Sequence, residues 1–259
     1  MKAILVTGGG SGIGRAVAQL FAARGWFVGV ADVDAAGLAD TLALLSPDRA
    51  RGYTMDVRQP DQWEATLAAF AAAAGQIDVL VNNAGVAEGG PFAEIDLARL
   101  DRVIDINFRG VAYGARLAFP HLRASGGVLL NTASASAIYG SAGLAAYSAT
   151  KFAVRGLTEA LDAEWAAEGV RVRALLPGFI DTPLLGMVMP GSNRTARDAV
   201  VEAKLEFTPV EQVADAAWAA VHGDAVHTFV GKTARRLAFA ARWMPGRLRK
   251  GMRARVLGG

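Results

Sequence analysis

Short apolar runs alternate along the chain with longer segments in which apolar residues recur at helical spacing. This alternation predicts βαβ units and a parallel sheet whose strands are covered on both faces. The predicted strands are Ala3–Thr7, Phe27–Ala31, Gly52–Met55, Val79–Val81, Val128–Asn131, Val170–Leu176 and, more weakly patterned, Thr228–Val230. The predicted helical segments are Arg15–Ala23, Ala35–Leu45, Asp61–Ala74, Leu97–Arg123, Ala146–Glu168 and Val210–His222. We therefore expect an α/β fold of the Rossmann type, with a doubly wound parallel sheet in a single domain.

Two segments depart from this alternation. Residues 180–209 are rich in proline, glycine and large apolar residues, which is typical of a lid over a ligand site. Residues 232–259 hold nine Lys or Arg and no Asp or Glu, whereas acidic side chains outnumber basic ones in residues 1–231. We expect a domain at 1–231 that includes the lid, followed by a basic, helical C-terminal extension.

Three interpretations of this basic extension stay open. It could be a helix packed on its own domain, or an interfacial anchor that contacts a membrane through Trp and Arg. Binding of nucleic acid is disfavoured because the acidic body would oppose it.

The composition narrows the other possibilities. The 259 residues include no cysteine, which excludes disulfides and thiolate metal ligands, and the three scattered histidines predict no metal site. No apolar stretch approaches the roughly 18 residues of a membrane span, and the first residues lack the pattern of a signal peptide. We expect a cytoplasmic protein, peripheral at the membrane surface if the extension is an anchor.

A glycine-rich segment directly follows the first predicted strand. Thr7-Gly8-Gly9-Gly10-Ser11-Gly12-Ile13-Gly14 joins that strand to the first helical segment. Glycines allow a tight turn and a close approach of the backbone to a diphosphate, which the positive end of the helix attracts. An ordinary turn also uses glycines, but this position favours a dinucleotide-binding loop. The expected cofactor-binding residues here are Gly8, Gly10, Ser11, Gly12, Ile13 and Gly14.

Asp32 ends the second strand pattern, the first to follow the glycine-rich segment. A carboxylate there accepts hydrogen bonds from the ribose hydroxyls of NAD and repels the 2′-phosphate of NADP. Residues 8–14 contain no Lys or Arg, and Val33 follows Asp32. Asp32 could instead cap the next helix, although Asp34 is better placed for that role. The pattern predicts NAD as the cofactor.

Tyr147 and Lys151 lie four residues apart at the start of a helical segment. This spacing puts the phenol and the ammonium on one helix face, where both can point into one cleft. A nearby cation and the positive nicotinamide ring favour the phenolate, so the pKa of Tyr147 should fall from about 10 and make it an acid/base. Such pairs are common by chance, but the chain uses 22 Arg and only five Lys, which indicates that an ammonium is wanted here.

Together these residues resemble the short-chain dehydrogenase/reductase family over residues 1–183. Further motifs match at Asn82–Gly85, at the asparagine of Asp105-Ile106-Asn107, at Ser134, which its spacing from Tyr147 selects over Ser136, and at Pro177-Gly178. The resemblance implies a single-domain, nicotinamide-dependent oxidoreductase that interconverts an alcohol and a carbonyl and forms a dimer or tetramer. The basic extension replaces the short C-terminal tail that packs across a tetramer axis in this family.

The resemblance also implies a role for each matching residue. Tyr147 exchanges a proton with the substrate oxygen, and Ser134 hydrogen-bonds that oxygen. Lys151 holds the nicotinamide ribose and lowers the tyrosine pKa, and Asn107 anchors a water that links Lys151 to solvent. The further cofactor contacts implied are Asp56 at the adenine amine, Asn83 bracing the sheet, Ile180 at the nicotinamide, Thr182 at the carboxamide or the phosphates, and Val57, Ala84, Gly85, Tyr147, Lys151, Pro177 and Gly178.

The lid carries a cluster of large apolar residues, Leu184, Leu185, Met187, Val188 and Met189. Flexible Met and Leu side chains adapt to bulky apolar ligands, and Val86, Ala135 and Ile138 would extend the wall. We therefore expect a hydrophobic secondary alcohol or its ketone rather than a sugar. The alternatives are a catalytically weak dinucleotide-sensing or scaffolding protein, an NADP-preferring carbonyl reductase, and dehydration or epimerisation on a related scaffold. The presence of all four catalytic residues favours an active dehydrogenase.

Overall fold

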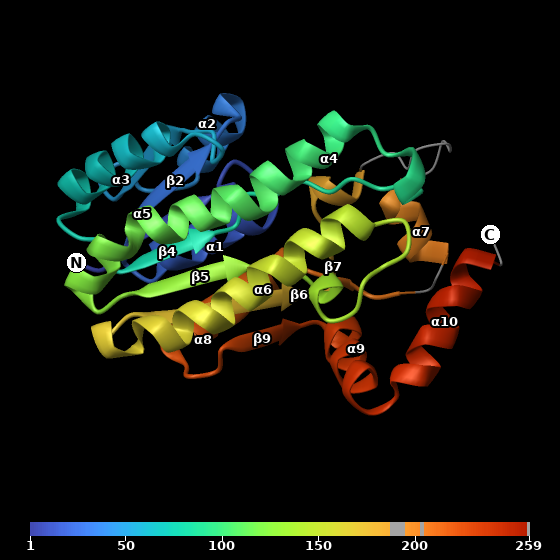
Figure 1. Ribbon diagram of the computed structural model, residues 1–259. Coiled ribbons are helices and arrows are strands. Elements are labelled where there is room, and N and C mark those ends of the chain that lie inside the picture. Colours follow the sequence, from blue (N-terminus) through green and yellow to red (C-terminus); the bar gives the residue numbers. More distant parts are fainter. Residues whose placement is uncertain (187–194, 203–204, 258–259) are drawn as a thin grey trace.

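A computed structural model describes residues 1–186, 195–202 and 205–257. Its central sheet has seven strands in the order β3-β2-β1-β4-β5-β6-β9, and every neighbouring pair is parallel (Figure 1). The strands are β1 (Ala3–Thr7), β2 (Phe27–Asp32), β3 (Ala50–Thr54), β4 (Val79–Asn82), β5 (Val128–Thr132), β6 (Arg171–Pro177) and β9 (His227–Val230). This order confirms the expected Rossmann-type fold.

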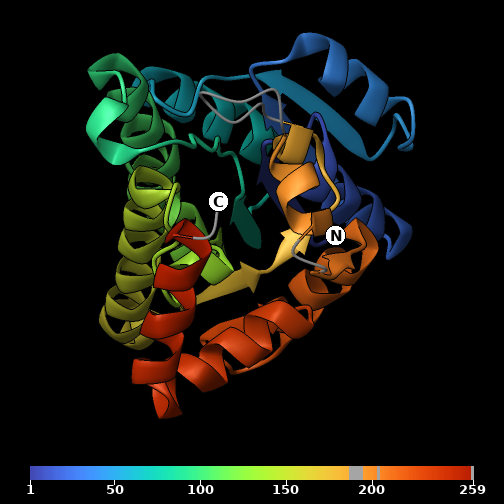
Figure 2. The same cartoon turned by 90° about the vertical axis from the view of Figure 1, so that its right-hand side faces the viewer.

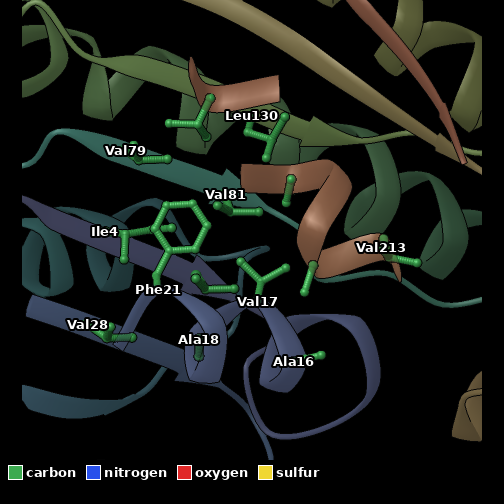
Figure 3. Close-up of a cluster of buried hydrophobic side chains, with 14 of the residues drawn as sticks. Ile4, Ala16, Val17, Ala18, Phe21, Val28, Val79, Val81, Leu130 and Val213 are labelled. Atoms are coloured by element: carbon green, nitrogen blue, oxygen red, sulfur yellow. The ribbon is translucent and has the colours of Figure 1, made fainter. Parts of the chain in front are cut away.

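Helices cover both faces of the sheet. Buried side chains of α1 (Gly12–Ala23), α2 (Ala35–Leu42) and α8 (Val210–His222) pack against one face. Those of α3 (Pro60–Ala74), α5 (Gly110–Ser125) and α6 (Ala145–Trp165) pack against the other. Figure 3 shows the buried apolar side chains between the sheet and the helices α1 and α8. Phe21 and Val17 of α1 point toward Ile4 and Val81 of the strands. Since both faces are covered, β1, β4 and β5 are buried along their whole length, which explains their unbroken apolar pattern.

The segment predicted as helical over Leu97–Arg123 is divided into parts. α4 (Leu97–Ile104) leads into a π-helical turn, η2 (Asp105–Arg109), before α5 begins at Gly110. The amide of Asn107, inside that turn, bonds both backbone groups of Val86 at 2.8 Å. A π-helical turn inside a longer helix is frequent at functional sites, so the break draws attention to Asn107.

The lid region after β6 contains short elements that the sequence pattern did not predict. β7 (Phe179–Ile180) and β8 (Phe207–Thr208) pair in parallel, and η5 (Pro183–Gly186) and α7 (Ala196–Glu202) lie between them in sequence. Two of the expected substrate residues, Met187 and Met189, fall outside the described residues, and so does Val188 of the same apolar cluster. The remaining short elements are the 3-10 turns η1 (Phe92–Glu94), η3 (Ala135–Ala137) and η4 (Ala166–Glu168).

The basic extension forms two helices, α9 (Lys232–Trp243) and α10 (Pro245–Leu257), joined at an angle (Figure 2). α9 packs against β9 and η3, and α10 packs against α9. Both lie beyond the carboxyl ends of the strands, on the same side of the molecule as α7 (Figure 1). Along the described ranges, no helix combines the length and the apolar character required to cross a bilayer.

Candidate active site

The residues singled out in the sequence gather at the carboxyl edge of the parallel sheet. The glycine loop follows β1, Asp32 ends β2, Asn83 follows β4, and Ser134 follows β5. β1 lies between β2 and β4, so the chain reverses its direction of progress across the sheet at this strand. Ligands of open α/β sheets bind in the crevice outside such a switch point.

The glycine loop leaves no room for side chains at several of its positions. A Cβ on Gly14 would lie 2.0 Å from the carbonyl oxygen of Gly8, and one on Gly8 would lie 2.9 Å from the Cα of Ala84. Gly8 and Gly12 also have positive φ angles of 64° and 50°, which favour glycine. Ser11, at the N-cap of α1, makes no side-chain capping bond, which leaves the start of that helix available to an anion. The loop therefore fits the diphosphate of a dinucleotide.

Asn83 and Thr7 fix this loop to the sheet. The Asn83 amide donates to the carbonyl oxygens of Thr7 and Gly8 at 3.0 and 3.3 Å. The Thr7 hydroxyl accepts from the backbone N–H groups of Asn83 and Ala84 and donates to the carbonyl oxygen of Val81. These bonds hold the ends of β1 and β4 in one arrangement, and they give Asn83 the bracing geometry that the family resemblance implies.

The Asp32 carboxylate is held beside the loop by two backbone bonds. Gly10 N–H donates to Oδ2 at 2.9 Å, and Asp34 N–H donates to Oδ1 at 3.1 Å. The cap of α2 is Asp34, whose carboxylate accepts from Ala36 N–H. Asp32 is therefore not the helix cap, and each of its oxygens retains accepting capacity for a hydroxyl group.

The Ser134 hydroxyl lies beside the Tyr147 hydroxyl and acts on its pKa as a hydrogen-bonding partner. Lys151, one turn along α6, places its Nζ 5.7 Å from the centre of the Tyr147 ring and donates to the carbonyl oxygen of Thr132 at 2.8 Å. The Lys151 side chain is only 4% exposed. Three of the four residues expected to be catalytic thus form one connected group.

Burial moves the pKa values of Tyr147 and Lys151 in opposite directions. Burial raises the pKa of Tyr147 above its ordinary value, and the hydrogen bond with Ser134 offsets part of that rise. Burial lowers the pKa of Lys151 to about 8. The expected lowering of the Tyr147 pKa by Lys151 is therefore not found in the chain alone, where desolvation of the phenol has the largest effect.

Asn107 is connected to this group through α6 and through the loop after β4. Its amide donates to the hydroxyl of Thr150 at 3.2 Å, and that hydroxyl donates to the carbonyl oxygen of Tyr147 at 2.8 Å. A Cβ placed on Gly85 would lie within 3.5 Å of both Asn107 Oδ1 and Lys151 Nζ, so these two groups flank the same small residue. The fourth expected catalytic residue is thus in position beside the other three.

The remaining expected cofactor residues lie in different surroundings. Arg58 binds the Asp56 carboxylate through two of its nitrogens and lowers the pKa of Asp56. Thr182 lies over the glycine loop that follows β1, since its methyl carbon is 3.1 Å from the position that a Cβ on Gly12 would take. Ile180 is 5% exposed and belongs to the core cluster of α1 and α8. Most of its surface therefore contacts the core.

The apolar residues assigned to the substrate pocket are spread over three segments. Ala135 and Ile138 follow Ser134, and Val86 is fixed by Asn107. In η5, Leu185 is partly buried and Leu184 is 39% exposed. A backbone bond from Gly90 N–H to the carbonyl oxygen of Gly143 joins the loop after β4 to the segment before α6. Of these segments, η3 adjoins Ser134 and the loop at Val86 adjoins Asn107.

Several residues that support the site were not anticipated. The Asn82 amide donates to Asn131 Oδ1 at 3.0 Å, and the Asn131 amide donates to the Thr158 hydroxyl at 3.0 Å. This buried ladder ties β4, β5 and α6 together beneath the catalytic group. The available signal was an asparagine at the end of each of two otherwise apolar strands, where a buried amide requires partners.

Comparisons with known proteins agree with this geometry. A family model described as short chain dehydrogenase matches residues 2–192, and the chain belongs to that family. It is 41% identical over 188 residues to cis-4-hydroxycyclohexanecarboxylate dehydrogenase of Sinomonas cyclohexanicum, covering 71% of this chain and 75% of that protein. It is 39% identical over 190 residues to D-threitol dehydrogenase of Mycolicibacterium smegmatis, covering 71% and 72%.

A solved structure extends the likeness to most of the chain. The 3-ketoacyl-(acyl-carrier-protein) reductase from Brucella melitensis, complexed with NADH, superposes with a TM-score of 0.79 at 30% identity and covers 90% of this chain and 98% of its own. The protein is thus of the oxidoreductase type, in a family that uses nicotinamide dinucleotides and whose members include alcohol dehydrogenases.

Proposed function

We propose that the protein is an NAD(H)-dependent dehydrogenase that interconverts a hydrophobic secondary alcohol and its ketone. The observation that carries the proposal is the pairing of the Tyr147 and Ser134 hydroxyls, with the buried ammonium of Lys151 one turn away. This arrangement supplies a proton donor and acceptor next to a second hydroxyl that can orient the substrate oxygen.

Tyr147 is the acid/base of the proposed reaction. When bound, the nicotinamide dinucleotide supplies the hydride acceptor for oxidation and the hydride donor for reduction. During oxidation the Tyr147 oxygen takes the hydroxyl proton of the alcohol, and during reduction it gives that proton to the carbonyl oxygen. Ser134 donates a hydrogen bond to the same oxygen. Lys151 would hold the ribose of the cofactor, and its positive charge favours the phenolate form of Tyr147.

The surroundings of Asp32 favour NAD over NADP. A 2′-phosphate would place negative charge against this carboxylate, at a cost that ribose hydroxyls do not incur. Arg15, the basic residue directly after the loop, donates to the carbonyl oxygens of Gly10 and Gly37 and to the Thr41 hydroxyl. A guanidinium engaged in this way is a poor partner for a phosphate. The NADH complex of the Brucella relative is consistent with this choice.

The substrate class is proposed from the apolar segments around the catalytic group. Val86, Ala135, Ile138 and Leu185 offer few hydrogen-bonding side chains to a polyol. The relative named for a cyclohexane substrate agrees with a bulky apolar ring, whereas the relative named for D-threitol acts on a polyol. The family likeness alone therefore does not decide between an apolar ring alcohol and a polyol. The proposed substrate class depends on the apolar residues near the catalytic group.

The decisive test is Tyr147→Phe, which removes one oxygen. We expect kcat for oxidation of a ring alcohol such as a substituted cyclohexanol to fall by about 10²- to 10⁴-fold, while the Kd for NADH changes less than threefold. Tyr113→Phe, which changes a partly buried tyrosine of α5, is the matched control and should keep kcat within twofold. Activity of Tyr147→Phe within tenfold of the wild type would remove Tyr147 from the mechanism.

The same assay separates the alternatives. A wild-type chain that binds NADH but turns over none of a panel of ring alcohols, aliphatic alcohols and polyols would support the dinucleotide-sensing alternative. Higher kcat/KM for polyols than for ring alcohols would contradict the proposed substrate class.

Cofactor choice is tested by Asp32→Ala. We expect the wild type to favour NAD by at least about tenfold in kcat/KM, and the variant to lose most of that preference because the repulsion of the 2′-phosphate is gone. Asp34→Ala, which removes the neighbouring helix cap, is the control and should keep the preference. Equal use of NAD and NADP by the wild type would contradict the assignment.

A further inference from the structure

The outer face of α9 carries two exposed aromatic residues among arginines. Phe239 is 59% exposed and Trp243 is 64% exposed, one helical turn apart. Lys232, Arg235, Arg236 and Arg242 are the other exposed residues of the helix. At about 100° per residue, all six fall within an arc of about 120°, with the aromatic rings near its centre and arginines on both sides. The exposed residues of α9 therefore form one continuous stripe.

The inner face of α9 is already packed against the protein. Ala234 is fully buried, and Leu237, Ala238 and Ala241 are partly buried where the helix meets β9 and η3. The helix therefore has a fixed orientation, and the aromatic stripe is the face that it turns away from the domain. A helix that used Phe239 and Trp243 for its own packing would bury them instead.

α10 extends the same positive surface. Its exposed residues include Arg247, Arg249, Lys250 and Arg253, while Leu248 and Met252 are partly buried. Over the described part of the extension, the one ion pair formed is between Lys232 and Glu206 at 3.7 Å. The extension contains no acidic residue that could neutralise its remaining Lys and Arg side chains. Positive charge is therefore concentrated at one end of a molecule whose preceding part, residues 1–231, carries more acidic than basic side chains.

We propose that the stripe of α9, together with the basic residues of α10, is a surface that binds an anionic phospholipid bilayer. Aromatic rings of Phe and Trp insert at the boundary between headgroups and acyl chains, and the flanking arginines can reach the lipid phosphates while their stems stay in the interface. Each basic residue near an anionic membrane strengthens binding by about fivefold in the partition coefficient. The two aromatic residues on this face can insert into the bilayer, and the several unpaired cations beside them can bind anionic headgroups.

The placement of this surface orients the enzyme on the membrane. α9 packs against η3, which begins at Ala135 directly after Ser134, and the backbone N–H of Ala234 lies 3.6 Å from the position of a Cβ on Gly178. The bilayer would therefore approach the carboxyl edge of the sheet, where the catalytic group lies. Binding itself does not depend on the proposed reaction.

Nucleic acid and a second copy of the chain are the competing occupants. A polyanion such as DNA would meet the same arginines, but it would also approach a body that is acidic overall, and a duplex offers little to two exposed rings. A second copy could pair its acidic surface with the basic extension, in which case the arginines would contribute to oligomerisation.

Vesicle co-sedimentation of the full chain tests the proposal. We expect binding at low salt to vesicles in which phosphatidylcholine and phosphatidylserine are mixed two to one, weaker binding at high salt, and little binding to pure phosphatidylcholine. Arg235→Gln/Arg236→Gln/Arg242→Gln should lower the partition coefficient by at least about tenfold. Phe239→Ser/Trp243→Ser should also lower it, with the charge unchanged.

The matched control is Arg24→Gln/Arg49→Gln/Arg123→Gln. These three exposed arginines lie at the amino edge of the sheet, opposite the extension, and the triple variant changes the net charge by the same amount. It should keep vesicle binding within twofold. NADH binding, measured for every variant, checks that the chain is folded and keeps this test separate from that of the proposed function.

Four results would overturn the proposal. Wild-type protein could stay in the supernatant with anionic vesicles at low salt, or the two arginine triples could weaken binding equally. The α9 triple could reduce the affinity for a single-stranded oligonucleotide while vesicle binding persists, which would assign α9 to nucleic acid. It could instead dissociate an oligomer, seen by light scattering, with no loss of vesicle binding, which would assign α9 to a second copy.

Discussion

Positive charge has different surroundings in the catalytic group and in the basic extension. Lys151 is 4% exposed, and its ammonium is fixed between the Tyr147 ring and the carbonyl oxygen of Thr132. Arg235, Arg236 and Arg242 of α9 are exposed, and no ion pair fixes them among the described residues. Both regions lie at the carboxyl edge of the sheet, so the difference does not arise from their position in the fold.

The difference teaches what each kind of charge is suited to do. Burial shifts the pKa of Lys151 to about 8 and makes the state of one proton depend on its neighbours. Exposed arginines stay charged at every accessible pH and act together at a surface. A single buried and fixed charge therefore marks a site of chemistry, whereas several exposed charges on one surface mark a site of contact. The following predictions test this contrast.

The pH profile should show the largest effect. Oxidation requires the Tyr147 phenolate, and burial raises the pKa of this phenol, so kcat/KM for oxidation should rise about tenfold per pH unit on the acidic side of that pKa. Reduction requires the phenol and should stay level over the same range. Ser134→Ala removes the hydrogen bond that lowers this pKa, so the rising limb should move to higher pH. An oxidation rate that is independent of pH, or that falls as pH rises, would contradict the role of Tyr147.

The next prediction compares two helical glycines, Gly14 of α1 and Gly156 of α6, which lie in different surroundings. A Cβ on Gly14 would collide with the Gly8 carbonyl oxygen, whereas one on the exposed Gly156 of α6 would meet nothing within 4 Å. Gly14→Ala should weaken NADH binding at least tenfold, since the loop must move, and should destabilise the fold by about 1–3 kcal/mol. Gly156→Ala should raise the free energy of unfolding by up to about 1 kcal/mol without changing the Kd for NADH.

Fluorescence titration with NADH and thermal unfolding of both variants are the measurements. Unchanged NADH affinity in Gly14→Ala would mean that the loop is not the cofactor site.

Much of the fold was predictable because its signals are strong and local. Strands buried on both faces appear as unbroken apolar runs, and the predicted limits of β1 match those found, while those of β2 and β4 differ by one residue. The glycine loop and the pair of Tyr147 and Lys151 were also visible, because short spacings determine which residues share a turn or a helix face.

The features that were missed depend on contacts between segments that are distant in sequence. The π-helical turn forms where Asn107 bonds Val86, 21 residues away, and a helical pattern carries no sign of such a bond. The strands β7 and β8 have two residues each, too few to show a period. The direction of the Tyr147 pKa shift was wrong for the chain alone, because sequence spacing reveals the nearby cation but not the degree of burial.

The last comparison concerns stability, and it takes one residue type in two regions. Phe21 of α1 is fully buried in the core, whereas Phe239 of α9 is 59% exposed. Phe21→Ala should lower the free energy of unfolding by about 3–5 kcal/mol, because it removes buried surface and leaves a cavity. Phe239→Ala should lower it by less than about 1 kcal/mol, since the ring makes few contacts that folding creates. Chemical denaturation of both variants without lipid measures the two values. If Phe239→Ala lowered the free energy of unfolding as much as Phe21→Ala does, the Phe239 ring would be part of the packed core. Phe239 would then not belong to an exposed contact surface, and the contrast with the packed catalytic group would not hold for this residue.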